Sequence, residues 1–196
     1  MNLRKYWSKI VNRIRLLGKI SHLYRIRKAR QVLKKLKEIA QNPDSNGRII
    51  VYLRKINPFI FEELILNVIE DSNLSIIRNR RYTGDGGIDG IFKVKSGKVL
   101  IQCKRYKSYI NNNDVKELCT KVKEGKYHFG IFVHTGKTGD KARETIKIEN
   151  NIIFISGSVL IDLILGKLHI EKHINNKISY NLKYNQNTQY NKSKSV

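Results

Sequence analysis

Three polar residues with complementary chemistry fall within one short stretch, Gly84–Tyr106, where a glycine-rich turn precedes two apolar segments. Asp89 follows the glycines, and Gln102 and Lys104 stand two positions apart in the second segment. If Ser96-Gly97 forms the turn of a β-hairpin, Asp89 lies opposite Lys104 and diagonal to Gln102. A carboxylate, an amide oxygen and an ammonium at that separation could hold a divalent cation and a water against a phosphate. The stretch therefore predicts an active site.

The elements that must position these groups can be predicted from apolar spacing. The second face of the hairpin is apolar and should pack on the core; its residues are Ile88, Phe92, Val94, Val99, Ile101 and Cys103. Upstream, Asn57-Pro58 is a favourable helix start, with Asn as N-cap and Pro at the first position. Apolar residues follow at helical spacing, namely Phe61, Leu64, Ile65, Val68 and Ile69. On this helix Glu62 lies at the edge of the apolar face, whereas Glu63 projects on the opposite side with Asn67 and Glu70.

These motifs, GDGGIDG at 84–90 and QCKRY at 102–106, resemble the catalytic core of the Mrr-type restriction endonucleases, within the PD-(D/E)xK nuclease superfamily. The match covers roughly Asn57 to Gly166. The resemblance implies a restriction-endonuclease-like fold and metal-dependent hydrolysis of DNA phosphodiester bonds. Mg²⁺ is the expected cofactor, and Mn²⁺ is expected to substitute for it.

The resemblance also assigns roles to particular residues. Asp89 binds the metal directly, helped by an oxygen of Gln102 where many relatives of the wider superfamily carry an acid. Lys104 orients or deprotonates the attacking water, and Glu62 holds the water or a second ion. Glu62 is preferred to Glu63 because the glutamate of the family's first helix follows an aromatic residue, as Glu62 follows Phe61. Asp89 is preferred to Asp85, whose carboxylate is expected to fix the turn instead.

Two other functions stay open. The same fold could grip DNA without cutting it, as a non-catalytic DNA-binding module. It could also be a structure-selective nuclease that acts on junctions or flaps in DNA repair or recombination. Methylation dependence does not follow from the resemblance, and a homodimer is expected only if both strands of a duplex are cut.

The charge of the chain favours a polyanionic partner. Its 196 residues carry a net charge of +23, with an isoelectric point near 10.1, which favours DNA; ribosomal or membrane-surface binding is the alternative. Two cysteines, Cys103 and Cys119, fit neither a zinc ribbon nor a disulfide framework, so we expect reduced thiols and a cytoplasmic protein. A run of eighteen apolar residues does not occur, and a membrane-spanning helix is therefore not predicted.

Much of this charge lies near the N-terminus, where residues 1–40 hold thirteen Lys or Arg and a single acid, Glu38. Apolar spacing predicts two amphipathic helices there, separated near Gly18 and Ser21-His22. We expect this arm to contact phosphates, although a membrane-surface helix or a helix packed on the core with a solvated basic face is the alternative. The expected nucleic-acid contacts are Arg13, Arg15, Arg25, Arg27, Lys28 and Arg30 of the arm, with Arg105 and Lys107 beyond the catalytic lysine.

The remaining segments predict an α/β fold with a mixed sheet flanked by helices. Strands are expected at 74–80, 129–133 and 152–155, and helices from Asp114, with Glu117 as its capping-box partner, and at 142–148 and 159–165. Strands joined through helices should be parallel, and the hairpin antiparallel. His134 at a strand end is expected to be structural or to contact phosphate. The predicted division is a basic helical extension and linker (1–47), a nuclease domain (48–170) and a polar, flexible tail (171–196).

Overall fold

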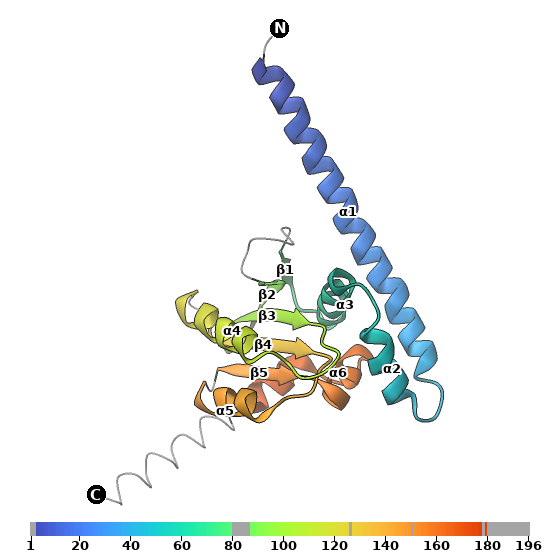
Figure 1. Cartoon of the computed structure of the whole chain (residues 1–196), viewed down its shortest axis with the longest axis vertical. Helices are drawn as coiled ribbons and strands as arrows, with labels where there is room; N and C mark the ends of the chain where they lie inside the picture. Colours follow the sequence, from blue (N-terminus) through green and yellow to red (C-terminus); the bar gives the residue numbers. More distant parts are fainter. Residues whose placement is uncertain (1–2, 80–86, 126, 150, 178, 180–196) are drawn as a thin grey trace, which may run out of the picture.

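The computed structural model describes residues 3–79, 87–125, 127–149, 151–177 and 179 of the 196-residue chain. A five-stranded sheet lies between two layers of helices (Figure 1). The helices are α1 (Leu3–Ile39), α2 (Ser45–Leu53), α3 (Pro58–Glu70), α4 (Asn112–Glu124), α5 (Asp140–Ile148) and α6 (Gly157–Ile164). The strands are β1 (Ile76–Arg78), β2 (Gly90–Val94), β3 (Gly97–Lys104), β4 (Phe129–His134) and β5 (Ile152–Ile155).

The sheet is mixed, as predicted. Its strand order is β1-β2-β3-β4-β5; the β1–β2 and β2–β3 pairs are antiparallel, and the β3–β4 and β4–β5 pairs are parallel. Parallel neighbours need crossover connections, which here contain α4 and α5. These two helices pack against one face of the sheet, through a cluster that includes Leu100 and Phe132. Helices α1, α2, α3 and α6 contribute to the larger cluster on the opposite face.

The hairpin forms, but its predicted register is wrong by two residues. Val94 pairs with Gly97 and Gly90 pairs with Ile101, so the turn is Lys95-Ser96 rather than Ser96-Gly97. Gly97 has a φ of +131°, a backbone conformation that favours glycine, and it therefore ends the turn as the first residue of β3. A two-residue shift preserves which face a side chain occupies.

The core face of the hairpin is therefore as expected, with one exception. Phe92, Val94, Val99, Ile101 and Cys103 are all buried in the larger cluster. The exception is Ile88, which packs instead against the cluster on the α4 side of the sheet. Ile88 precedes β2, which begins at Gly90, so the alternation of a strand does not extend to it.

Helix α1 is one continuous helix, so the predicted break near Gly18 and Ser21-His22 is wrong. A lone glycine inside a helix costs only about 1 kcal/mol and does not force a break. The first half of α1 projects away from the sheet, whereas its second half lies along α3 (Figure 1). In this second half Ala29, Val32, Leu33 and Leu36 are buried in the larger core cluster.

The folded unit extends beyond both predicted boundaries. The boundary at residue 47 falls inside α2, an unpredicted helix that buries Ile49 and Leu53. The boundary at residue 171 falls inside a helix over 170–177, whose Ile170 and Ile174 are buried. Two apolar residues four positions apart are enough to dock a single turn of helix, even where the composition is mostly polar. Most of the remaining predicted tail, like the first part of the glycine-rich turn, lies outside the described residues.

The predicted helix ends are confirmed in part. The Asn57 side chain caps α3, with its Oδ1 accepting a 2.9 Å hydrogen bond from the Phe59 amide. Helix α4, however, is capped by Asn111 and not by Asp114, because the Asn111 side chain reaches the Asn113 amide first. Asp114 accepts a hydrogen bond from the Tyr106 hydroxyl instead. In the described part of the chain, every helix is too short or too polar to cross a membrane.

Candidate active site

Four predicted site residues come together where α3 meets the open end of the β2–β3 hairpin. Glu62 lies on α3, Asp89 directly precedes β2, and Gln102 and Lys104 lie on β3. Burial, the largest cause, raises the pKa of Glu62 to about 8, and the nearby Asp89 carboxylate adds to this rise. The Lys104 ammonium and the Arg25 guanidinium act in the opposite direction and lower the same pKa. The Glu62 carboxyl therefore lies within electrostatic reach of both Asp89 and Lys104.

Asp89 is held by the two strands on either side of it. Its amide donates to the Ile101 carbonyl at 3.0 Å, and its Oδ2 accepts a 2.6 Å hydrogen bond from the Cys103 amide. On the other side, the Asn79 amide donates to the Asp89 carbonyl at 3.0 Å, and Asn79 Nδ2 donates to the Ile88 carbonyl at 2.8 Å. The position of this carboxylate is therefore fixed by the sheet and not by a mobile loop.

Gln102 is buried beside these carboxylates without an internal partner. Its side chain is only 1% exposed, and neither its Oε1 nor its Nε2 makes a hydrogen bond within the described part of the chain. Leaving a buried polar atom unpaired costs about 1–3 kcal/mol. Gly87, with a φ of +74°, lies so close that an added Cβ would come within 2.7 Å of Gln102 Nε2 and 3.9 Å of Lys104 Nζ.

The arrangement fits a hard divalent cation. Glu62, Asp89 and the Gln102 amide offer oxygen donors, which Mg²⁺ and Mn²⁺ prefer. Between the described residues no group of three His, Cys, Asp or Glu side chains gathers in a metal-binding arrangement, because only two of the three donors here are acids. Repulsion between Glu62 and Asp89 contributes to the raised pKa of Glu62, and a cation between them would remove it. The unpaired Gln102 oxygen would find a partner in the same ion.

His134 has the structural alternative of its two predicted roles. It pairs with Lys104 across the β3–β4 ladder, yet its side chain is fully buried. Its ring lies 5.3 Å from the Phe154 ring and 5.6 Å from the Phe132 ring, measured between centroids. Burial lowers the pKa of His134 to about 4, so the imidazole is neutral at physiological pH. A fully buried neutral ring cannot contact a phosphate.

The basic residues predicted to bind nucleic acid fall into different environments. Arg27, Lys28 and Lys107 are exposed, whereas Arg105 donates a hydrogen bond to the Arg54 carbonyl. Arg30 pairs with Asp71, with its Nη1 2.7 Å from both carboxylate oxygens.

The other arm residues differ in how they relate to the site. Arg25 lies over the Phe59 ring at 4.6 Å and acts on Glu62. Arg13 and Arg15 belong to the first half of α1, which projects from the domain, and their side chains are not described.

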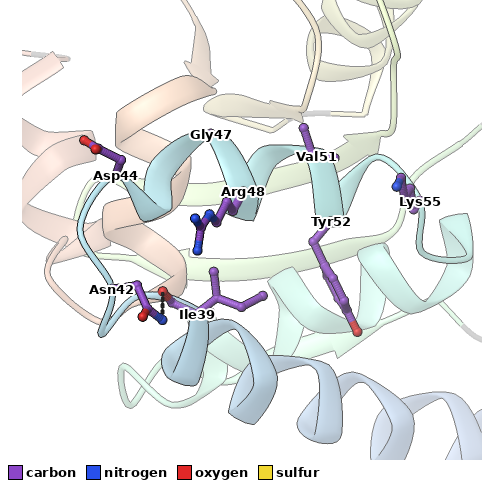
Figure 2. A pocket seen from close by; sticks show the side chains of 8 residues that line it. All are labelled: Ile39, Asn42, Asp44, Gly47, Arg48, Val51, Tyr52 and Lys55. Atoms are coloured by element: carbon purple, nitrogen blue, oxygen red, sulfur yellow. Dashed lines mark hydrogen bonds between the residues drawn. The ribbon is translucent and has the colours of Figure 1, made fainter.

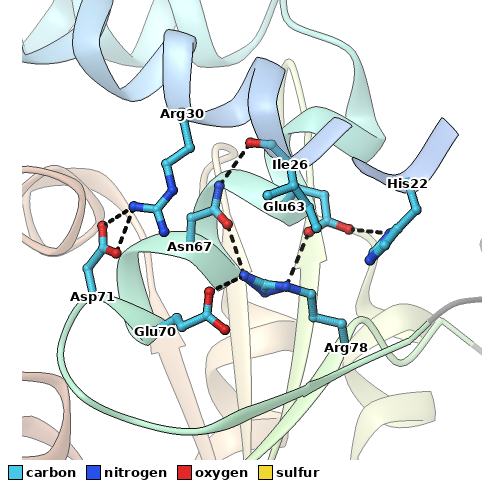
Figure 3. A network of polar contacts seen from close by, with 8 residues as sticks. All are labelled: His22, Ile26, Arg30, Glu63, Asn67, Glu70, Asp71 and Arg78. Atoms are coloured by element: carbon cyan, nitrogen blue, oxygen red, sulfur yellow. Dashed lines mark hydrogen bonds and ion pairs between the residues drawn. The ribbon is translucent and has the colours of Figure 1, made fainter. Parts of the chain in front are cut away.

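Glu63 has an environment that the sequence did not predict. We expected it to face solvent, but it is 1% exposed and forms an ion pair with His22 of α1 at 3.3 Å (Figure 3). Asn67, on the same side of α3, is fully buried as well. The prediction failed because α1 covers the polar side of α3. The signal was the composition of α3, which is apolar on nearly all sides and is therefore typical of a buried helix. Asp85 lies outside the described residues.

A separate pocket of about 580 Å³ lies where α1 turns into α2 (Figure 2). It contains none of the four predicted catalytic residues. The pocket is lined by Ile39, Asn42, Asp44, Gly47, Arg48, Val51, Tyr52 and Lys55.

A helix carrying a glutamate, packed on a hairpin that presents an aspartate, an amide and a lysine, is the arrangement that the resemblance to the PD-(D/E)xK nucleases implies. Comparison with known families agrees. Residues 53–164, more than half of the chain, match a family model described as "Restriction endonuclease", and the chain belongs to this Mrr-type family.

Individual relatives are distant. The chain is 23% identical over 142 residues to the type IV methyl-directed restriction enzyme EcoKMrr of Escherichia coli (strain K12), a match that covers 69% of this chain and 45% of that protein. The chain thus spans less than half the length of this curated relative.

Two solved structures are also similar. The MspJI restriction endonuclease in complex with a 27-mer oligonucleotide is 16% identical, with a TM-score of 0.40, over 79% of this chain and 35% of that one. The DNA modification-dependent restriction endonuclease AspBHI is 19% identical, with a TM-score of 0.47, over 71% of this chain and 40% of that one.

Proposed function

We propose that this chain is a metal-dependent DNA endonuclease that hydrolyses phosphodiester bonds with Glu62, Asp89, Gln102 and Lys104. One observation carries the proposal: a buried glutamine with both amide atoms unpaired lies beside two carboxylates and a lysine. An unpaired buried amide is a cost that folding alone does not explain, whereas a ligand that binds there removes it. Membership in the restriction endonuclease family supports the same reaction.

In this proposal Asp89, Gln102 Oε1 and Glu62 would hold Mg²⁺, and Mn²⁺ would replace it. A bound ion lowers the pKa of water and offsets the negative charge that develops on the phosphate. Glu62, with a pKa of about 8, is largely protonated at neutral pH in the metal-free protein and gives up that proton when it serves as a ligand. Asp89 needs no rearrangement, because the Cys103 amide and Asn79 already fix it.

Lys104 would act on the attacking water and on the phosphate. It is partly exposed at the end of β3, two residues from Gln102 and within reach of Glu62. Its ammonium can orient a water molecule by donating a hydrogen bond, and it stabilises the charge that accumulates on the phosphate oxygens in the transition state. Gly87 supports this role because a side chain at that position would occupy the space next to Lys104 Nζ.

DNA is the proposed substrate because of the charge of the chain. A net charge of +23 is far larger than solubility requires, and Lys and Arg supply most contacts to phosphates. Arg27, Lys28 and Lys107 are exposed cations on or near the elements that carry the site. Cutting both strands of a duplex with one site per chain would require two copies of the chain.

The test is to incubate the purified chain with Mg²⁺ or Mn²⁺ and a panel of plain, methylated and branched DNA. We expect cleavage that depends on the added cation and stops with EDTA. The panel also separates a restriction enzyme from a structure-selective nuclease, because only the latter would prefer the branched substrates. Binding to DNA without cleavage of any substrate under either cation would instead favour a non-catalytic DNA-binding module.

A further inference from the structure

A buried polar network joins α1, α3 and β1 beside the proposed catalytic residues (Figure 3). At its centre is Glu63, whose side chain is 2% exposed. Glu63 Oε1 lies 3.3 Å from His22 Nδ1 on α1, and Glu63 Oε2 lies 3.8 Å from Arg78 Nε on β1. The Arg78 side chain is itself only 12% exposed. One carboxylate thus connects three elements in a place that water barely reaches.

Asn67 and Glu70 complete the contacts of Arg78 one and two turns further along α3. Arg78 Nη2 donates to Asn67 Oδ1 at 2.9 Å and to Glu70 Oε2 at 2.6 Å. Asn67 Nδ2 in turn donates to the Ile26 carbonyl of α1 at 3.2 Å. Because Asn67 is fully buried, its amide would lose this partner if α1 were absent. Helix α1 therefore covers the network and also supplies hydrogen-bonding groups to it.

The two ends of the Glu63–Arg78 pair lie next to the two proposed metal-binding carboxylates. Glu63 directly follows Glu62 on α3. Arg78 pairs with Gly90, the residue directly after Asp89, and its neighbour Asn79 holds the Asp89 carbonyl. The ion pair is therefore a cross-link between the helix that presents Glu62 and the strands that present Asp89.

We infer that Glu63 and Arg78, covered by His22 of α1, are positioning residues that fix the separation of Glu62 and Asp89 for cleavage. The inference rests on the proposed function. It also makes α1, which lies outside the family-matched residues 53–164, a part of the catalytic unit and not only an arm that contacts DNA. Misplacing a reacting group by 1 Å can reduce the rate by about 10²-fold, so a stiff cross-link between two ligands matters to catalysis.

The structure contains a matched control for a merely structural role. Arg30 and Asp71 also join α1 to the end of α3, with 2.7 Å between Arg30 Nη1 and Asp71 Oδ1. This pair is about half exposed, with 47% and 45% of the two side chains accessible, and it does not involve the strands. Asp71→Asn thus loosens the contact between the two helices without touching the cross-link between Glu62 and Asp89.

The experiment compares Glu63→Gln, Arg78→Gln, Arg78→Lys and Asp71→Asn in the full chain. We expect Glu63→Gln and Arg78→Gln to lower kcat for DNA cleavage by about 10–100-fold and to leave KM within about twofold. Arg78→Lys should recover part of the loss because it keeps the charge, and Asp71→Asn should cleave like wild type. Thermal unfolding and DNA binding in EDTA measure the folded fraction, so that kcat is given per folded molecule.

Mn²⁺ binding, measured by calorimetry, supplies a readout that does not need cleavage. Groups that orient metal ligands typically change affinity by about 10–100-fold when they are mutated, and we expect Glu63→Gln to weaken Mn²⁺ binding by about tenfold. If wild type binds Mn²⁺ but cuts no DNA, the proposed function fails, and the affinities still decide whether the network positions the carboxylates. The inference is overturned if kcat per folded molecule and Mn²⁺ affinity are unchanged in Glu63→Gln, or if Asp71→Asn lowers them equally.

Discussion

The pKa of Glu62 leads to a quantitative prediction about stability. In the folded, metal-free protein this pKa is raised from 4.5 to about 8, first by burial and then by the charge of Asp89. Between these two pH values the folded state keeps a proton that the unfolded chain has released, so the free energy of unfolding falls as the pH rises. Above about pH 8 the folded group ionises as well, and the loss reaches its limit. Glu62→Gln cannot ionise and should escape this loss.

The magnitude follows from the shift. At about 1.4 kcal/mol per pKa unit, the difference between 4.5 and about 8 corresponds to at most about 5 kcal/mol. Glu62 keeps partial solvent exposure, and screening therefore reduces the expected gain of Glu62→Gln over wild type to about 2–4 kcal/mol at pH 9. At pH 5 the two proteins should differ by less than about 1 kcal/mol.

The assay is equilibrium unfolding in urea with EDTA, followed by circular dichroism at several pH values. With a slope of about 2 kcal/mol per molar urea, the variant's midpoint should exceed that of wild type by about 1–2 M at pH 9. In an Asp89→Asn background the gain should shrink, because one cause of the raised pKa is gone. A gain that is the same at pH 5 and pH 9 would refute the reasoning that Glu62 is held protonated in the free protein.

Three further predictions concern other residues. Gln102→Glu should keep cleavage and need less Mg²⁺, whereas Gln102→Leu should abolish it, as measured by the Mg²⁺ dependence of the rate; full activity of the Leu variant would remove Gln102 from the site. Deleting residues 1–19 should weaken DNA binding and lower the log–log salt slope by about 0.9 per lost contact, with thermal unfolding unchanged; an unchanged slope would exclude phosphate contacts by this segment. His134→Phe should lose the destabilisation that wild type shows as the pH falls from 6.5 to about 4, about 2–3 kcal/mol in urea unfolding, because the buried neutral ring resists protonation; an equal loss in both proteins would contradict this.

Local patterns predicted most of the elements that carry the candidate site. Alternating apolar residues identified the hairpin, and the apolar runs at β4 and β5 identified strands that are parallel because helices connect them. The cap at Asn57 placed the start of α3, and therefore Glu62, correctly. These features depend on residues that are close together in the sequence, where periodicity and capping are strong signals.

Features that depend on distant contacts could not be predicted in the same way. The hairpin register depended on whether Gly97 lies in the turn or ends it, a choice of one residue that shifts every pair by two positions. The environment of Glu63 depended on α1, which lies about forty residues earlier in the chain and covers the side of α3 that periodicity assigned to solvent. Likewise, Ile170 and Ile174 dock a helix within a mostly polar segment, because tertiary packing outweighs composition there.

The central claim is tested most directly by replacing Asp89 with alanine and measuring cleavage and binding separately. The carboxylate is proposed to hold the metal, and its negative charge repels the phosphate that it helps to cut. We therefore predict that Asp89→Ala shows no Mg²⁺-dependent cleavage, yet binds DNA in EDTA at least as tightly as wild type. Cleavage by Asp89→Ala at the wild-type rate would contradict the account, because the metal would then have to be held by other residues.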